Sequence, residues 1–155
     1  MKVLIFAHER KGFAMIVRNC AGGIVFNNDN KVLLLKNEKG EWVFPKGVIR
    51  NSDLSQEVAV KRVKEEAGVT AEIVSTIGHT NYEFFYVTRQ KPVCNKVVWF
   101  IMKSSDDKVN ISEKEKFNDG GFYSMEDALN MVTYSQDKAI LNLSYRAYSE
   151  MSQGV

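Results

Sequence analysis

Blocks of apolar residues in the first part of the chain predict a series of β-strands. Residues 14–26 (AMIVRNCAGGIVF) are rich in β-branched side chains, and the pair Gly22-Gly23 favours a bent or bulged strand. Turn-forming residues at 27–30 (NNDN) lead into a second apolar run at 31–37, which predicts a hairpin.

Later apolar segments extend the predicted sheet. Residues 70–88 give one or two strands and end in the aromatic sequence NYEFFYV. Residues 93–103 are apolar almost throughout, which predicts a central strand, because strands buried on both faces form continuous apolar runs. A polar stretch at 104–121 precedes a short strand, FYS. The opening MKVLIFA is interrupted at 8–11 (HERK), so it predicts a strand rather than a signal peptide or a spanning helix.

Three segments carry helix signals. The first spans 53–68, where Asp53 with Gln56 reads as an N-cap and capping box, and Gly68 as the stop. The second, MEDALNMV, follows a capping box formed by Ser124 and Asp127. The third, at 136–151, is amphipathic. Its expected apolar stripe consists of Ile140, Leu143, Ala147 and Met151.

Strands and helices mix along the chain without strict alternation. This order predicts an α/β (α+β) protein with a mixed central sheet and helices on both faces. The length of 155 residues and the 45% hydrophobic and 26% charged content fit one soluble domain over 1–155. Cys20 and Cys94 lie far apart in no CxxC pattern, as expected for core thiols of a cytoplasmic protein. The formal net charge of +2 gives no strong signal for nucleic acid or membrane partners.

The helix predicted at 53–68 has two faces of different chemistry. Its core-facing stripe consists of Ala59, Val60, Val63 and Ala67. Arg62, Glu65 and Glu66 share the opposite face, because residues three and four apart are neighbours on a helix. Such a face is either a solvated set of salt bridges or a metal site in which a cation has replaced one ligand.

The sequence around this helix resembles the Nudix (MutT-like) family, whose signature is G, five residues, E, seven residues, then R-E-U-x-E-E-x-G-U, with U aliphatic. The approach W-V-F-P-K-G ends at Gly47, the first signature position. Asp53 stands at the first Glu position and Lys61 at the Arg position. Arg62 stands where the next Glu is expected, which reverses the charge. The remaining matches are Val63, Glu65, Glu66, Gly68 and Val69.

The resemblance covers the whole chain and implies a Nudix-type α/β/α sandwich. It also implies hydrolysis of a pyrophosphate linkage in a nucleoside diphosphate derivative with Mg²⁺ or Mn²⁺, which favours hard oxygen ligands. By the same resemblance, Glu65 and Glu66 are expected metal ligands and catalytic groups, with Gly47 grouped at the metal site. Further acids for a base or ligand are Glu57, Glu113 and Glu115; for the last two a solvated loop is the alternative.

Arg62 leaves three accounts of this site open, because a guanidinium stays protonated and cannot bind a metal ion. The site is catalytically dead and binds a phosphorylated ligand, with Arg62 replacing the metal. Or it keeps a reduced metal site on Glu65 and Glu66, helped by another acid. Or Arg62 swings outward. The expected function is therefore a Nudix hydrolase or, alternatively, a module that binds a nucleotide without hydrolysing it.

Candidate ligand contacts lie outside the helix. Lys46 and Lys96 are candidate phosphate contacts, with surface lysines as the alternative. Tyr82 and Tyr86 share one face of a strand, where either core packing or stacking with a purine base accounts for them. The motifs are most similar to the diadenosine polyphosphate branch of the family. The expected partner is a small nucleotide, and a homodimer is left open.

Overall fold

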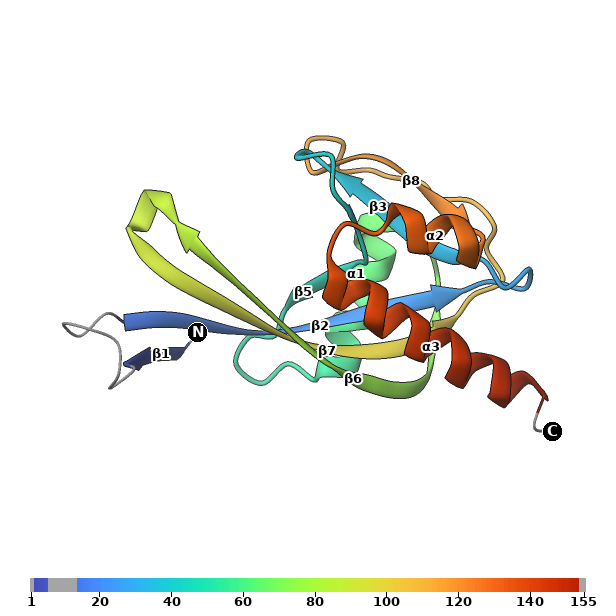
Figure 1. The fold of residues 1–155 in the computed structure, drawn as a ribbon, viewed down its shortest axis with the longest axis horizontal. Helices are drawn as coiled ribbons and strands as arrows, with labels where there is room; N and C mark the ends of the chain where they lie inside the picture. Colours follow the sequence, from blue (N-terminus) through green and yellow to red (C-terminus); the bar gives the residue numbers. More distant parts are fainter. Residues whose placement is uncertain (1, 6–13, 154–155) are drawn as a thin grey trace.

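The computed structural model describes residues 2–5 and 14–153, and its elements follow the order expected from the sequence (Figure 1). In chain order they are β1 (Lys2–Ile5), β2 (Ala14–Phe26), β3 (Val32–Asn37), β4 (Trp42–Val43), β5 (Lys46–Val48), α1 (Ser55–Ala67), β6 (Glu72–Tyr86), the 3₁₀ turn η2 (Val87–Arg89), β7 (Lys91–Lys103), β8 (Phe117–Tyr123), α2 (Met125–Met131) and α3 (Ser135–Gln153). The expected opening strand is present as β1, while the HERK segment lies outside the described residues.

Strand β2 organises the sheet, because it pairs with other strands along both of its edges. One edge runs parallel to β7, from Ile16 beside Val93 to Phe26 beside Lys103. The other edge pairs antiparallel with β1, β5 and β3 in turn. β7 also pairs antiparallel with β6, so it lies inside the sheet. The predictions of a mixed sheet and of an internal strand at 93–103 are confirmed.

Helices cover both faces of this sheet, as predicted, and an apolar cluster lies under each face (Figure 1). On one face, α1 packs Ala59, Val63 and Ala67 into the cluster that includes Ala21 and Val25 of β2. On the other face, α2 and α3 cover the cluster that contains Ile24 and Phe26. The alternation of β2 residues between the two clusters follows from the period of two in a strand.

Gly22 allows β5 to lie close against β2. A Cβ atom at this position would lie 2.6 Å from the carbonyl oxygen of Pro45 and 2.9 Å from Cβ of Lys46. The register with β7 runs unbroken through Gly22 and Gly23, so the expected bulge is absent there. The glycine serves a close approach between strands rather than a break in one of them.

The ends of α1 agree with the sequence at one terminus only. Gly68 adopts the left-handed conformation (φ 71°), and its N–H donates to the carbonyl of Lys64, as expected for a helix stop. The expected cap at Asp53 is wrong: the helix begins after Leu54 without a side-chain cap. The Asp53 carboxylate instead accepts a hydrogen bond from the Arg50 N–H (3.2 Å), which closes the preceding loop.

The helices after β8 show a confirmed cap and a stripe that is confirmed at Ile140 and Ala147 only. Ser124 caps α2 by accepting a hydrogen bond from the Asp127 N–H at 3.1 Å. On α3, Leu143 and Met151 are exposed, although the sequence placed them on the apolar stripe. The buried side contains Asp137, Ile140, Leu141 and Ser144. The sequence pattern did not reveal this side because two of these four residues are polar.

Two further expectations concern cysteines and membranes. Cys20 and Cys94 are buried and unpaired, as predicted for core thiols. Among the described residues, no helix has both the length and the apolar character needed to cross a bilayer.

We predict that Gly22→Ala destabilises the protein by about 2–4 kcal/mol, because the added methyl group must displace the Pro45 carbonyl or the Trp99 ring. Denaturant unfolding measures this loss. Gly121→Ala is the control, since its Cβ would meet mainly the end of the Tyr123 side chain at 3.2 Å. Equal stability of Gly22→Ala and the wild type would contradict the close approach of β5 to β2.

Candidate functional site

The side chain of Arg62 lies directly against the backbone of Gly47. A Cβ atom on Gly47 would fall 2.8 Å from Cδ of Arg62 and closer still to two other atoms of that side chain. Gly47 is buried, and Arg62 is partly buried. Strand β5 and helix α1 are therefore packed together at this glycine, and any larger residue at position 47 would push the Arg62 side chain away from its present position.

The Arg62 guanidinium faces both expected metal-binding carboxylates. Its Nη1 atom lies 3.9 Å from Oε1 of Glu65 and 3.8 Å from Oε2 of Glu66. The two glutamates differ in environment, because the Glu65 side chain is 44% exposed and Glu66 only 6%. The sequence placed Glu66 on the outer face of the helix, and this was wrong. The carboxylate is covered where α1 meets β5.

Burial controls the protonation of Glu66. Loss of solvent raises the pKa of its carboxyl group from 4.5 to about 7. The positive charges of Arg62 and Lys46, a hydrogen bond from the Lys46 backbone N–H and the more distant charge of Lys116 oppose this shift. Near neutral pH the group is therefore divided between its charged and neutral forms, unlike an ordinary surface glutamate.

The additional acids expected from the sequence lie outside this arrangement. Glu57 is exposed in the first turn of α1. In the loop before β8, Glu113 pairs with Lys116 at 3.1 Å, and Glu115 is exposed. The loop is fixed to the end of α1 by the Asn110 N–H, which donates to the Ala67 carbonyl at 2.7 Å. It brings the charge of Lys116, rather than a carboxylate, toward Glu66.

These residues do not fit a divalent metal ion in the arrangement observed. Within residues 2–5 and 14–153, no group of three or more His, Cys, Asp or Glu side chains is close enough to hold one. The position between Glu65 and Glu66 is occupied by the Arg62 guanidinium, which would repel a divalent cation. Without a displacement of Arg62, the pair of carboxylates forms a salt-bridge cluster and not a metal site.

A cleft of about 340 Å³, which we call the aromatic cleft, opens on the side of the sheet that carries α3. Tyr82 and Tyr134 form its aromatic wall, with ring centroids 5.7 Å apart at 68°. The Nζ atom of Lys46 lies 5.8 Å from the centre of the Tyr82 ring. Phe84 and Asn95 continue the lining along β6 and β7. The cleft combines ring surfaces with two cations, Lys39 and Lys46, and three acids, Glu41, Glu83 and Asp137. The rings suit a ligand that carries an aromatic base, and the two lysines are its candidate phosphate contacts.

Hydrogen bonds hold the two tyrosines in place. Tyr82 donates its hydroxyl hydrogen to Asp137, a residue 2% exposed at the start of α3. Burial raises the pKa of both groups. Tyr134 donates to Glu41, and burial together with this bond raises its pKa to about 12. Both rings therefore stay neutral at physiological pH and present fixed surfaces.

The expected ligand contacts are only partly brought together. Lys46 and Tyr82 meet in the aromatic cleft. Lys96 is exposed on β7, directly after Asn95, which lines the cleft. Because successive side chains of a strand point to opposite faces, Lys96 points away from the cleft. Tyr86 lies farther along β6, beside a second cavity. Sequence reasoning missed Tyr134 and Asp137, because helix and loop positions far along the chain carry no motif that links them to Lys46.

We predict that the free energy of unfolding falls as pH rises from 4.5 to about 7 through the contribution of Glu66. In this range the folded protein holds a proton that the unfolded chain has released, so deprotonation disfavours the folded state by up to about 3 kcal/mol. Denaturant titrations across this range should show the fall in the wild type and in Glu65→Gln. It should be absent in Glu66→Gln, and an unchanged fall there would rule out Glu66 as its source.

Comparison with known proteins agrees with this arrangement of elements. A family profile described as the NUDIX domain matches residues 17–143. An RNA pyrophosphohydrolase of Hydrogenovibrio crunogenus is 29% identical over 106 residues, which cover 61% of this chain and 64% of that protein, just under two thirds of its length. The asymmetrical bis(5′-nucleosyl)-tetraphosphatase of Mus musculus is 27% identical over 117 residues, or 74% of this chain and 78% of that protein.

Solved structures show the same fold. A MutT protein from Methanosarcina mazei superposes with a TM-score of 0.66 at 20% identity, covering 86% of this chain and 96% of that one. An Ap4A hydrolase from C. elegans in a binary complex gives a TM-score of 0.62 at 22% identity, covering 89% and 99%. The family profile spans most of the described residues, including α1 and both walls of the aromatic cleft. The chain belongs to the NUDIX domain family.

Proposed function

We propose that this protein binds a nucleoside polyphosphate. Its base lies in the aromatic cleft, and its phosphates are directed toward Lys46 at the start of β5 and toward Glu66 on α1. One observation carries the proposal: Lys46 connects the two regions. Its ammonium group lies over the Tyr82 ring in the cleft, while its backbone N–H donates to Glu66 on α1. A ligand whose base rests on Tyr82 has its phosphates beside this lysine and the helix.

The charges around Glu66 favour an anionic ligand. Three cations, Arg62, Lys46 and Lys116, lower the pKa of this buried carboxyl group, so all three are close enough to act on it. Glu65 and Glu66 oppose them, and Glu66 is partly neutral near pH 7. The region therefore carries a positive balance, and Arg62 supplies charge where a metal ion would otherwise neutralise phosphate.

The names of the relatives support the ligand class and also favour hydrolysis, whereas the arginine at position 62 favours binding alone. The names of the two curated relatives describe a pyrophosphohydrolase of RNA and a tetraphosphatase of dinucleosides, both of which act on linked phosphates. The arginine at position 62 favours ligand binding over metal-dependent hydrolysis, because Glu65 and Glu66 already form ion pairs with its guanidinium group. We therefore favour binding without metal-dependent hydrolysis.

Hydrolysis is the second candidate, and one observation favours it. The two distances from Arg62 to the carboxylates, 3.9 and 3.8 Å, exceed those of hydrogen bonds, so the ion pairs are loose. The Arg62–Glu65 pair is partly exposed, and an exposed ion pair contributes only about 0–1 kcal/mol. A ligand with a bound Mg²⁺ or Mn²⁺ ion could displace the guanidinium, after which Glu65 and Glu66 would be free to bind the metal.

We predict that Arg62→Glu weakens metal-free binding of ATP or diadenosine tetraphosphate about tenfold or more, the effect of losing one charged contact to phosphate. The same variant should gain affinity for Mn²⁺, because it presents three carboxylates on one helical face. Calorimetric titration measures both affinities. Lys138→Glu on the exposed side of α3 is the control for charge reversal and should leave both values unchanged.

Chromatographic analysis of the nucleotide products separates the two candidates. With Mg²⁺ or Mn²⁺ the wild type should leave both nucleotides intact, forming neither ATP and AMP nor ADP from diadenosine tetraphosphate and no AMP from ATP, while still binding both without metal. Metal-dependent cleavage that is lost in Glu66→Gln would establish hydrolysis instead. Failure of both nucleotides to bind, with or without metal, would overturn the proposal that the cleft holds a nucleoside polyphosphate.

A further inference from the structure

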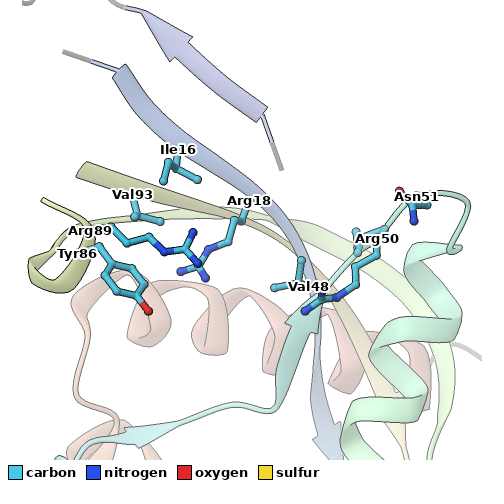
Figure 2. Close-up of a pocket in the computed structure, with 9 residues that line it drawn as sticks. Ile16, Arg18, Val48, Arg50, Asn51, Tyr86, Arg89 and Val93 are labelled. Atoms are coloured by element: carbon cyan, nitrogen blue, oxygen red, sulfur yellow. The ribbon is translucent and has the colours of Figure 1, made fainter. Parts of the chain in front are cut away.

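A second cavity, of about 470 Å³, lies beside the aromatic cleft and contains three arginines (Figure 2). We call it the arginine pocket. Arg18 comes from β2, Arg50 from the loop between β5 and α1, and Arg89 from η2. Figure 2 shows the side chains of Arg18 and Arg89 converging beside the Tyr86 ring, with Arg50 directed toward the same space from the opposite wall. The rest of the described lining consists of Ile16, Val48, Ile49, Asn51 and Val93.

The positive charge of this pocket is not balanced by the protein groups that line it. Its described lining contains no Asp or Glu side chain. Over residues 2–5 and 14–153, none of the three arginines forms an ion pair with a carboxylate. Three like charges that face one space repel one another, and an anion bound between them would remove this repulsion. Guanidinium groups also match the geometry of phosphate oxygens.

Two of the arginines are held in place by neighbours that leave donors free. Arg18 donates from Nε to the Asn95 side chain at 3.0 Å, and its guanidinium lies 5.6 Å from the centre of the Phe84 ring. Its terminal amino groups make no hydrogen bond with the described residues. Arg89 stacks 5.6 Å over Tyr86. These contacts orient the guanidinium groups before a ligand arrives, which lowers the entropy lost on binding.

The arginine pocket and the aromatic cleft share a wall. Phe84 and Asn95 line the cleft, and both contact Arg18, which lines the pocket. Along this face, tyrosine and phenylalanine rings from Tyr82, Phe84 and Tyr86 are accompanied by the cations Lys46, Arg18 and Arg89. Rings that accept stacked bases, beside cations that follow a phosphate backbone, form the pattern used to bind single-stranded nucleic acid.

We propose that the arginine pocket binds backbone phosphates of a single-stranded oligonucleotide whose terminal nucleotide occupies the aromatic cleft. This inference rests on the proposed function, because it uses the cleft as the site of the first nucleotide, and it names the ligand class. The oligonucleotide extends from the cleft across Phe84 and Arg18, and its following phosphates lie between Arg50 and Arg89.

The test compares ATP with 5′-triphosphorylated oligoadenylates of two to about six nucleotides, the lower part of the range that one small binding domain covers. The full-length protein should bind the longer chains about tenfold or more tightly than ATP. In Arg50→Ala/Arg89→Ala this advantage should disappear. Both residues are exposed, so their replacement leaves the core intact. Lys138→Ala/Arg146→Ala, which removes the same charge from exposed positions of α3, should keep the advantage.

Salt dependence gives an independent readout of the same contacts. For a single strand, each phosphate contact contributes about 0.7 to the slope of log affinity against log salt, so the double arginine variant should lose about 1.4 from that slope. The control variant should lose much less. A variant that lowered affinity merely by disturbing the fold would not reduce the slope by this amount.

The outcomes separate this inference from the proposed function. If ATP binds and longer chains bind no more tightly, the oligonucleotide proposal is wrong and the nucleotide proposal stands. If longer chains bind through the arginines but ATP does not bind, the nucleotide proposal is wrong, and so is the placement of the terminal nucleotide in the aromatic cleft. Diadenosine tetraphosphate that binds as tightly as the oligonucleotides, and depends equally on Arg50 and Arg89, would assign the pocket to a dinucleotide instead. Absence of all binding overturns both.

Discussion

The packing of Arg62 against Gly47 determines the chemistry of this Nudix helix. Because position 47 has no side chain, the arginine can lie against β5 and place its guanidinium beside both Glu65 and Glu66. Glu66 is buried, and this burial raises its pKa to about 7. The residue pattern of the family is thus retained in outline, with a positive side chain facing both carboxylates.

The sheet extends this arrangement into a larger binding surface. β5 brings Lys46 toward Tyr82. The Gln136 side chain on α3 accepts a hydrogen bond from the backbone N–H of Asn81 on β6 and donates one to its carbonyl, which helps to keep Tyr82 and Asp137 together. The long strands β2, β6 and β7 then carry the aromatic and basic residues beyond the helix.

Patterns that are local in sequence predicted the fold well. The apolar runs of β2 and β7, the glycine stop of α1 and the Ser124 cap depend on neighbouring residues and were correct. The stripe on α3 was correct at Ile140 and Ala147 but not at Leu143 and Met151, and the buried side also includes Asp137 and Ser144. Burial of Glu66, and the meeting of Arg18, Arg50 and Arg89, depend on contacts between distant segments. No periodicity in one segment reports such contacts.

We propose that Arg62 occupies the place of a metal ion. Paramagnetic broadening of backbone amide NMR signals by substoichiometric Mn²⁺ tests this in the wild-type protein. Selective broadening of an amide signal requires Mn²⁺ to be bound near that amide. The amides of Gly47, Glu65 and Glu66 should stay sharp in the wild type and broaden in Arg62→Glu. Selective broadening at these three positions in the wild type would show that a metal binds despite the arginine, which contradicts the account.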